Sequence, residues 1–221
     1  FATDKKIEYL VVNGAECEPY ISTDNRTMID GTEYVARGVN LIEKYIPGPQ
    51  KIIFAVEENK PAAIKKLKEI FATDPKVEIA TLPSTYPQGA EGVLIYNLTG
   101  RVVPEGKLPS DIGCIMFNVT SVAYFAYYLE TGIPFVWKTV TVDGSAVREP
   151  KNVTAPIGTS LRDILTFADA DFEDIGKVLY GGPMMGMAIS REDIPVTKGC
   201  SGILALDKVG ALQEENPCIR C

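Results

Sequence analysis

Residues 1 to about 135 alternate between short strand-like runs and helix-like segments. The strand-like runs are rich in aliphatic and β-branched residues, and apolar residues recur at helical spacing between them. We expect strands at residues 8–12, 51–56, 77–82 and 112–117, each followed by a helix. Because this alternation is typical of a parallel sheet covered by helices, the sequence predicts an α/β fold for this part of the chain.

The pattern changes at about residue 136, where a second structural unit is expected. Residues 136–142 alternate with period two, Asp143-Gly144 is a dipeptide typical of hairpin turns, and residues 146–153 are predicted to return as the second strand. The segment Thr159-Ser160-Leu161-Arg162-Asp163 then resembles a capping box that opens a helix, and residues 177–180 predict a further strand. A hairpin, a helix and further strands within so short a segment predict a small β-grasp-like domain.

Polar residues follow three of the four predicted strands of the first part. Asn13 begins the first polar loop, a second runs from Pro83 to Glu91, and Asn118 begins the third. The carboxyl ends of parallel strands share one edge of the sheet, where open α/β sheets bind their ligands. For any single loop a solvated turn is the alternative. The edge is expected to carry Glu16, Glu18, Tyr86, Glu91 and Asn118.

The absence of histidine restricts the chemistry open to the chain. None of the 221 residues is His, which removes Ser-His-Asp and Cys-His catalysis and His-ligated zinc and makes a hydrolase a poor candidate. The net charge of -7 argues against nucleic acid as a partner, since phosphate binding needs clustered Lys and Arg. The run Lys65-Lys66-Leu67-Lys68 is expected to be an exposed helix face.

The five cysteines divide into two groups. Cys17, Cys114 and Cys200 are scattered and form no disulfide framework, which favours a reducing, cytosolic compartment. Cys218 and Cys221 form a C-x-x-C motif, a spacing that lets two thiolates reach one metal ion or one iron-sulfur cluster. They supply half of the four ligands that such a site needs.

Several motifs, in their order along the chain, resemble the C subunit of the Rnf electron transport complex. The resemblance runs the whole length of the chain. That family is similar to the flavoprotein subunit of respiratory complex I, in which flavin mononucleotide (FMN) lies on a Rossmann-like domain followed by a β-grasp domain of the soluble-ligand-binding type. The motifs are Val12-Asn13-Gly14-Ala15-Glu16-Cys17-Glu18-Pro19-Tyr20, Tyr86-Pro87-Gln88-Gly89-Ala90-Glu91, Val140-Thr141-Val142-Asp143-Gly144, Gly181-Gly182-Pro183-Met184-Met185-Gly186 and Pro217-Cys218-Ile219-Arg220-Cys221.

The resemblance implies three domains and a set of site residues. Residues 1–135 would be a Rossmann-like flavin- and nicotinamide-binding domain without its upstream glycine-rich segment, residues 136–215 a β-grasp domain, and residues 216–221 the start of a truncated ferredoxin-like domain. Cys218 and Cys221 are implied ligands of [4Fe-4S] clusters. Ala15, Ala90 and Phe117 depart from the complex I loops. The residues implied to contact FMN or NAD(H) are Asn13, Glu16, Glu18, Tyr86, Gly89, Glu91 and Asn118.

The function implied by the resemblance is electron transfer between NADH and ferredoxin through flavin and [4Fe-4S] clusters. Partner subunits would couple this transfer to ion transport, so the chain would be part of an oxidoreductase and translocase, inactive as an isolated fragment. It would lie peripherally at the cytoplasmic face of the cell membrane. Its partners would be the membrane subunits of the Rnf complex, ferredoxin and NADH, with no nucleic acid among them.

Two alternatives remain open at this point. One is a cobalamin-reductase-type subunit with the same core, which the downstream cysteines and the gene neighbours would distinguish. The other is a non-catalytic ligand-binding or docking module, which would show no saturable flavin binding. The role of the turn from Gly181 to Gly186 is likewise open, because its sequence suits either an ordinary turn or a close approach of the backbone to a ligand.

Overall fold

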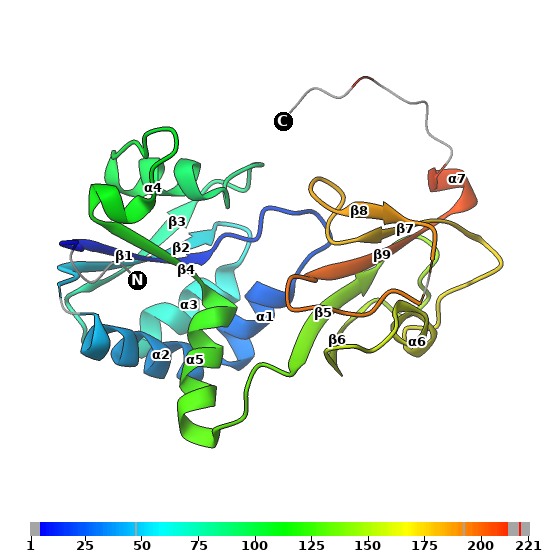
Figure 1. Cartoon of the computed structure of the whole chain (residues 1–221), viewed down its shortest axis with the longest axis horizontal. Coiled ribbons are helices and arrows are strands. Elements are labelled where there is room, and N and C mark those ends of the chain that lie inside the picture. The colour runs from blue at the N-terminus through cyan, green and yellow to red at the C-terminus, as the bar shows by residue number, and fades with distance from the viewer. Residues whose placement is uncertain (1–4, 47, 192, 212–216, 218–221) are drawn as a thin grey trace. The chain divides into compact units, whose positions relative to one another are not determined.

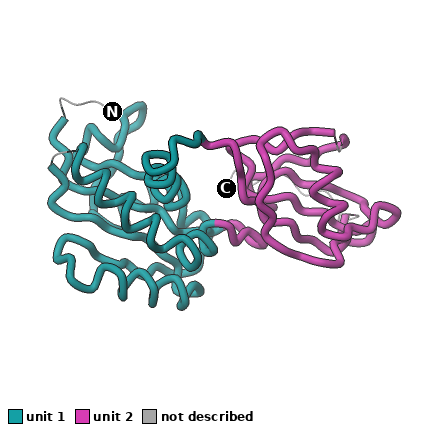
Figure 2. Tube along the Cα trace, turned by 90° about the horizontal axis from the view of Figure 1, so that it is seen from below, with its two compact units in different colours: residues 1–17, 24–134 teal, residues 18–23, 135–221 magenta. Residues whose placement is uncertain are grey.

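The computed structural model describes residues 5–46, 48–191, 193–211 and 217. The chain divides into two compact units (Figure 2). Unit 1 comprises residues 1–17 and 24–134, and unit 2 comprises residues 18–23 and 135–221. The segment of residues 18–23 therefore belongs to unit 2, although it follows the first strand of unit 1.

Unit 1 alternates strands and helices along the chain, which confirms the predicted α/β class (Figure 1). The helix α1 was not predicted, since its sequence shows little apolar periodicity. A 3-10 helix, η1, covers Pro109–Ile112, so the last strand begins at Cys114 rather than at residue 112. The elements are β1 (Tyr9–Gly14), α1 (Thr23–Asp30), α2 (Thr32–Tyr45), β2 (Lys51–Glu57), α3 (Pro61–Ile70), β3 (Val77–Leu82), α4 (Glu91–Thr99), β4 (Cys114–Asn118) and α5 (Val119–Thr131).

The four strands of unit 1 form a parallel sheet in the order β3-β2-β1-β4. β1 pairs with both of its neighbours, so that Asn13 lies opposite Ala55 on β2 and Asn118 on β4. Glu57, the last residue of β2, pairs with Leu82 on β3. All four strands end at the same edge, as the crossover connections require. β2 therefore ends between β1 and β3.

Helices cover both faces of this sheet, as Figure 1 shows. On one face α2, α3 and α5 bury residues such as Val39, Leu67 and Val122 against the strands. On the other face α4 packs Leu94 into a smaller cluster. Gly38 allows α2 and α5 to approach closely, because a Cβ at this position would lie 2.1 Å from the carbonyl oxygen of Val122.

Unit 2 is a mixed five-stranded sheet in the order β6-β5-β9-β7-β8, covered by the helix α6. β5 pairs antiparallel with β6 and parallel with β9, and β7 pairs antiparallel with β8 and β9. This arrangement confirms the predicted β-grasp class. The elements are β5 (Trp137–Asp143), β6 (Lys151–Pro156), α6 (Leu161–Phe167), β7 (Ile175–Tyr180), β8 (Met187–Ile189), β9 (Gly202–Asp207) and α7 (Lys208–Ala211).

The first hairpin of unit 2 differs from its prediction. The second strand, β6, begins at Lys151 and not at residue 146, because Ala146 and Val147 are buried in the core of the unit instead of pairing with β5. Gly144 adopts a φ of 119°, and a Cβ there would lie 2.2 Å from the carbonyl oxygen of Ala205. The connection is therefore a packed loop and not a two-residue turn.

The capped helix predicted in unit 2 is confirmed. Ser160 is the N-cap of α6, and its Oγ accepts a hydrogen bond from the backbone N–H of Asp163 at 3.1 Å. Leu161, Ile164 and Leu165 are buried on one face of the helix. The local sequence is sufficient here because a cap is a contact between residues three positions apart.

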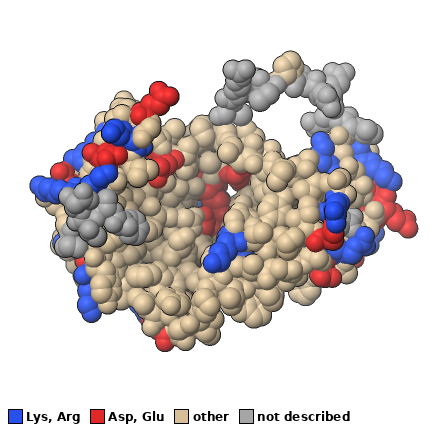
Figure 3. Space-filling view, in the orientation of Figure 1, with Lys and Arg blue, Asp and Glu red and all other residues tan. Residues whose placement is uncertain are grey.

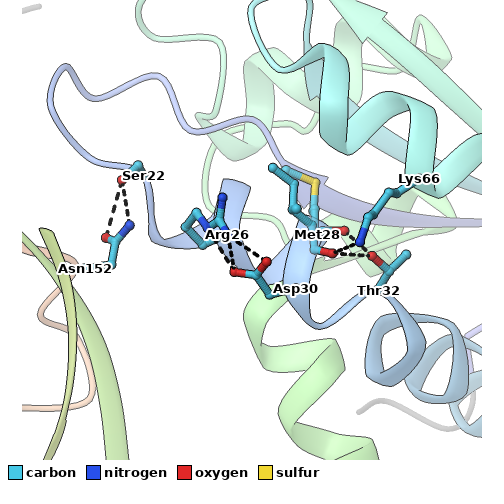
Figure 4. Close-up of polar contacts among 8 residues, drawn as sticks. Ser22, Arg26, Met28, Asp30, Thr32, Lys66 and Asn152 are labelled. Atoms are coloured by element: carbon cyan, nitrogen blue, oxygen red, sulfur yellow. Dashed lines mark hydrogen bonds and ion pairs between the residues drawn. The ribbon is translucent and has the colours of Figure 1, made fainter.

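The charged side chains on the visible surface are of mixed sign (Figure 3). Lys65, Lys66 and Lys68 are exposed on α3 while Leu67 is buried, which confirms the predicted exposed helix face. Lys66 donates a hydrogen bond from Nζ to the backbone oxygen of Ile29 at 2.7 Å (Figure 4). Within the described ranges, no helix combines the length and the apolar character needed to cross a membrane.

Candidate functional site

The carboxyl edge of the unit 1 sheet is closed by a contact between two loops. Asn13 donates a hydrogen bond from Nδ2 to the backbone oxygen of Gly89 at 3.1 Å, and its Oδ1 accepts one from the N–H of Ala15 at 3.0 Å. The Gly89 N–H in turn donates to Sγ of Cys17 at 3.4 Å. β2 lies between β1 and β3, so this contact joins the loops that follow the strands on either side of β2.

Gly89 is required at this contact for a steric reason. A Cβ at this position would lie 2.7 Å from the backbone oxygen of Ala15, which is too close for any side chain. The glycine therefore allows the two loops to meet at backbone distance. The sequence-based expectation that the loops after β1 and β3 converge agrees with these hydrogen bonds.

Glu16 is buried, with 8% of its surface exposed, and binds the first turn of α1. Its Oε1 accepts a hydrogen bond from the N–H of Asp24 at 2.8 Å, and its Oε2 accepts one from the N–H of Asn25 at 3.2 Å. Burial, and then the charge of Asp24, raise the pKa of Glu16 to about 7, against the opposing effect of the two backbone hydrogen bonds and of Lys60. Glu16 therefore changes its charge near neutral pH.

Asn118 begins α5 and contacts α1 through Asp24. As the N-cap it accepts hydrogen bonds on Oδ1 from the N–H groups of Thr120 and Ser121. Its Nδ2 donates to Oδ2 of Asp24 at 2.7 Å, and the Thr120 hydroxyl donates to Oδ1 of Asp24 at 2.6 Å. Asp24 was not predicted as a site residue. The signal available in the sequence was an acidic residue at the start of α1, a helix that was itself not predicted.

Glu18 lies in unit 2, whereas Glu16 lies in unit 1. The two oxygens of Glu18 accept hydrogen bonds from the backbone N–H groups of Met184, at 2.9 Å, and Met185, at 2.7 Å. A Cβ at Gly182 would lie 2.3 Å from Oε2 of Glu18, so a larger residue there would displace the carboxylate. Two N–H groups of the turn from Gly181 to Gly186 thus bind a carboxylate of the chain.

Tyr86 and Glu91 flank Gly89 in the second loop. Tyr86 is half-buried, and Glu91 is exposed as the first residue of α4. The N-cap of this helix, Ala90, provides no side-chain hydrogen bond, so Glu91 supplies the negative charge that favours a helix N-terminus. Both residues are therefore placed at the carboxyl edge that the sequence predicted for them.

Two further polar groups at this edge are buried without a partner. Oε2 of Glu57 and Nε2 of Gln88 have no hydrogen-bond partner among the described residues, and the two residues are only 2% and 5% exposed. Burial raises the pKa of Glu57, and the charge of Lys60 opposes this shift. The sequence signal for Glu57 was a charged residue directly after the apolar residues 52–56 of β2.

The donor and acceptor set of this edge suits a polar, planar ligand. Gln88 offers an unused N–H donor and Glu57 an unused acceptor. A flavin ring presents both N–H and C=O groups on one edge, so it carries the two kinds of group that these atoms lack. The residues present therefore fit a flavin.

Comparison with known proteins identifies the family. A family model described as the Nuo51 FMN-binding domain matches residues 1–126, and one described as the SLBB domain matches residues 139–188. The chain belongs to the Nuo51 FMN-binding domain family. Its first unit carries most of the matched region, and its second carries the SLBB domain.

Curated relatives of this family agree with the motif-based resemblance. The chain is 43% identical over 219 residues to the C subunit of the proton-translocating ferredoxin:NAD(+) oxidoreductase complex of Clostridium ljungdahlii, a match that covers 99% of the chain and 48% of that relative. It is 40% identical over 219 residues to the C subunit of the Na(+)-translocating ferredoxin:NAD(+) oxidoreductase complex of Acetobacterium woodii, covering 99% and 49%. The chain thus spans about half the length of these relatives, and the resemblance to the Rnf C subunit is confirmed.

Solved structures of the same fold include an NAD+-reducing [NiFe]-hydrogenase. Its H2-reduced form superposes with a TM-score of 0.74 at 20% identity, covering 91% of this chain and 40% of that chain. The air-oxidised form gives the same TM-score at 22% identity. At this level of identity the likeness concerns the fold alone, and it supports a Rossmann-like unit followed by a β-grasp unit.

The predicted cluster ligands Cys218 and Cys221 lie outside the described residues. Within the described part of the chain, no group of three or more His, Cys, Asp or Glu residues is placed to hold a metal ion. Cys17, Cys114 and Cys200 are free thiols. Burial raises the pKa of the Cys114 and Cys200 thiols, which makes these two poor thiolate ligands.

Proposed function

We propose that unit 1 is the flavin- and nicotinamide-binding part of an Rnf-type C subunit that transfers electrons between NADH and ferredoxin. The observation that carries this proposal is the match to the FMN-binding domain over residues 1–126, combined with an edge of the sheet where polar groups converge. The names of the two curated relatives support the same reaction.

The residues proposed to hold FMN lie on the loops that close this edge. A bound flavin supplies hydride acceptance and one-electron transfer, so no residue of the chain has to act as an acid or base. The residues of the chain orient the flavin and exclude water from it. Asn13 joins two of the loops, and Gly89 brings its backbone close to Ala15. The set proposed for FMN is Asn13, Tyr86, Gly89, Glu91 and Asn118.

Glu16 and Glu18 are proposed to contact NAD(H). Carboxylate oxygens accept hydrogen bonds from ribose hydroxyls and from the carboxamide NH2 group. Each oxygen of Glu18 accepts one backbone hydrogen bond, from Met184 or Met185, and so has a further lone pair for a ligand. Both oxygens of the buried Glu16 accept backbone hydrogen bonds, so its proposed contact with NAD(H) is carried over from the motif alone.

The exit path for electrons is proposed to begin at Cys218 and Cys221. The C-x-x-C spacing suits two thiolates of a [4Fe-4S] cluster whose remaining ligands come from outside residues 1–221. Ferredoxin and the membrane subunits of an Rnf complex would be the partners of the intact subunit. A peripheral place at the cytoplasmic face of the membrane follows from those partners.

The proposal is tested by flavin binding to the intact subunit. Fluorescence titration of the flavin-free protein with FMN should show saturable binding, and NADH should bleach the bound flavin under anaerobic conditions. Asn13→Ala should weaken FMN binding by about tenfold because it removes the hydrogen bond that joins the two loops. Asn97→Ala, at an exposed position of α4, is the matched control. A wild-type subunit without saturable FMN binding would show that the chain is a docking module.

A further inference from the structure

Glu57 ends β2 at the middle of the carboxyl edge of unit 1. It is 2% exposed, and its Oε2 has no hydrogen-bond partner among the described residues. A buried polar atom left unpaired costs free energy, and a buried carboxyl costs more. A chain that keeps a carboxyl in this position therefore needs a ligand or a water molecule to satisfy it.

The strand order decides which ligand lies near Glu57. β2 is flanked by β1, which ends at Asn13 and Gly14, and by β3, whose following loop carries Gly89. The hydrogen bond from Asn13 to Gly89 joins the loops that follow β1 and β3, the two strands on either side of β2. A ligand that contacts both of these loops therefore has to pass the end of β2 and Glu57.

The loop that follows the neighbouring strand β3 adds a second unpaired group of the opposite polarity. Gln88 lies in this loop one residue before Gly89, and its Nε2 is a buried donor without a partner in the described part of the chain. The nearby charge is that of Lys60, which acts on both Glu57 and Glu16. An unused acceptor and an unused donor on adjacent segments indicate a ligand that carries both kinds of group.

We propose that Glu57 contacts the flavin directly, its carboxyl accepting a hydrogen bond from an N–H or O–H group of FMN. The proposal rests on the flavin-binding function proposed above. It adds to that site a residue at the end of β2, the one strand of unit 1 whose end carries none of the residues proposed so far. Gln88 donates to an acceptor of the same ligand. Glu57 thus contributes to affinity for the oxidised flavin and is not required for folding.

The test uses the opposite signs that stability and binding should show. Glu57→Met in the intact subunit replaces an unpaired buried carboxyl by an apolar side chain of similar size, so the flavin-free protein should melt at a higher temperature. The same variant should bind FMN about tenfold more weakly, because one hydrogen bond to the ligand is lost. Glu58→Met is the matched control, since Glu58 is the next residue and is exposed.

A second variant keeps the proposal testable if Glu57→Met does not fold. Glu57→Gln retains the size and one acceptor oxygen, and FMN binding to it should fall between the wild type and Glu57→Met, with Glu58→Gln as its control. If the Glu57 variants bind FMN with the affinity of the wild type, the proposal is overturned, and the partner of the carboxyl is a buried water molecule only. A wild-type subunit without any FMN binding refutes the flavin function itself, whereas normal binding in wild type and in the Glu57 variants refutes only the role of Glu57.

Discussion

Glu16 and Glu18 stand two positions apart in the sequence but bind backbone groups of different units. Glu16 accepts hydrogen bonds from the start of α1, and Glu18 accepts them from the turn that holds Met184 and Met185. Both carboxylates therefore have a structural role in addition to their proposed contact with NAD(H). For a substitution at either residue, the stability of the variant should be measured before a change in its activity is interpreted.

Stability should depend on pH through Glu16. Its folded pKa of about 7 lies above its usual value of 4.5, so its stabilising contribution is full at low pH and is lost as pH rises through 7. The free energy of unfolding of wild type relative to Glu16→Gln should therefore fall by about 2 to 3 kcal/mol between pH 5 and pH 8. Urea denaturation at both pH values measures it.

The control for this experiment is Glu105→Gln, which changes an exposed carboxyl of the same unit. Its free energy of unfolding should follow that of the wild type at both pH values. If Glu16→Gln also follows the wild type across the pH range, the carboxyl of Glu16 is not buried as the structure has it.

The role of Glu18 should be visible in hydrogen exchange. Glu18→Gln leaves only one acceptor oxygen for two N–H groups, so the amides of Met184 and Met185 should exchange about tenfold faster, by loss of roughly 1.4 kcal/mol. Glu173→Gln, exposed in the same unit, is the control. Unchanged exchange at both amides would mean that Glu18 does not hold this turn in solution.

At the scale of elements, the approach of α2 to α5 depends on one small residue. Gly38 lies on α2, and the carbonyl oxygen of Val122 on α5 occupies the space that a Cβ would need. The two helices pack against the same face of the sheet as α3 (Figure 1). The helix α1 carries an ion pair on its exposed side, between Arg26 and Asp30 one turn apart (Figure 4).

Gly38→Ala should destabilise unit 1 by about 1 to 3 kcal/mol, because the added methyl group forces α2 away from α5. Gly92→Ala is the matched control. Gly92 lies in the first turn of α4, where a Cβ would meet no atom within 4 Å, and alanine is the better helix former there. Thermal denaturation compares the two, and a Gly38→Ala protein as stable as Gly92→Ala would contradict the close packing.

At the scale of the molecule, the chain passes between its two units more than once. It leaves unit 1 after Cys17, returns at Asp24, and enters unit 2 again at Phe135. Within unit 2, the early segment is bound by Ser22, whose N–H donates to the Thr141 hydroxyl at 3.0 Å and whose hydroxyl pairs with Asn152 (Figure 4). Unit 2 is therefore incomplete if the chain is cut at residue 135.

The cluster proposal predicts the iron content of the intact subunit. Cys218→Ser or Cys221→Ser should lower it by one cluster, roughly four iron atoms, because a ligand of a [4Fe-4S] site is lost. Cys17→Ser is the control, since Cys17 accepts a hydrogen bond from Gly89 in unit 1 and is not a proposed ligand. Undiminished iron in the first two variants would remove the proposed electron exit path.

The sequence by itself determined the alternation of strands and helices, the cap of α6 and the polar ends of three strands. These features depend on contacts between residues close in the chain, such as Ser160 with Asp163. It also placed the polar loops after the first, third and fourth strands at one edge, because the carboxyl ends of parallel strands share an edge. The sequence did not predict where β6 starts or that α1 exists, because neither segment carries a periodic apolar pattern.

Only the tertiary structure decided what the polar side chains bind. The partners of Glu18 are about 166 positions away, as Met184 shows, and no local pattern specifies such a pair. Glu57 is likewise buried although it is a charged residue at the end of a strand, and nothing in the neighbouring sequence specifies that burial. Hydrogen bonds and burial are properties of atoms brought together by the whole fold, whereas periodicity is a property of neighbours along the chain.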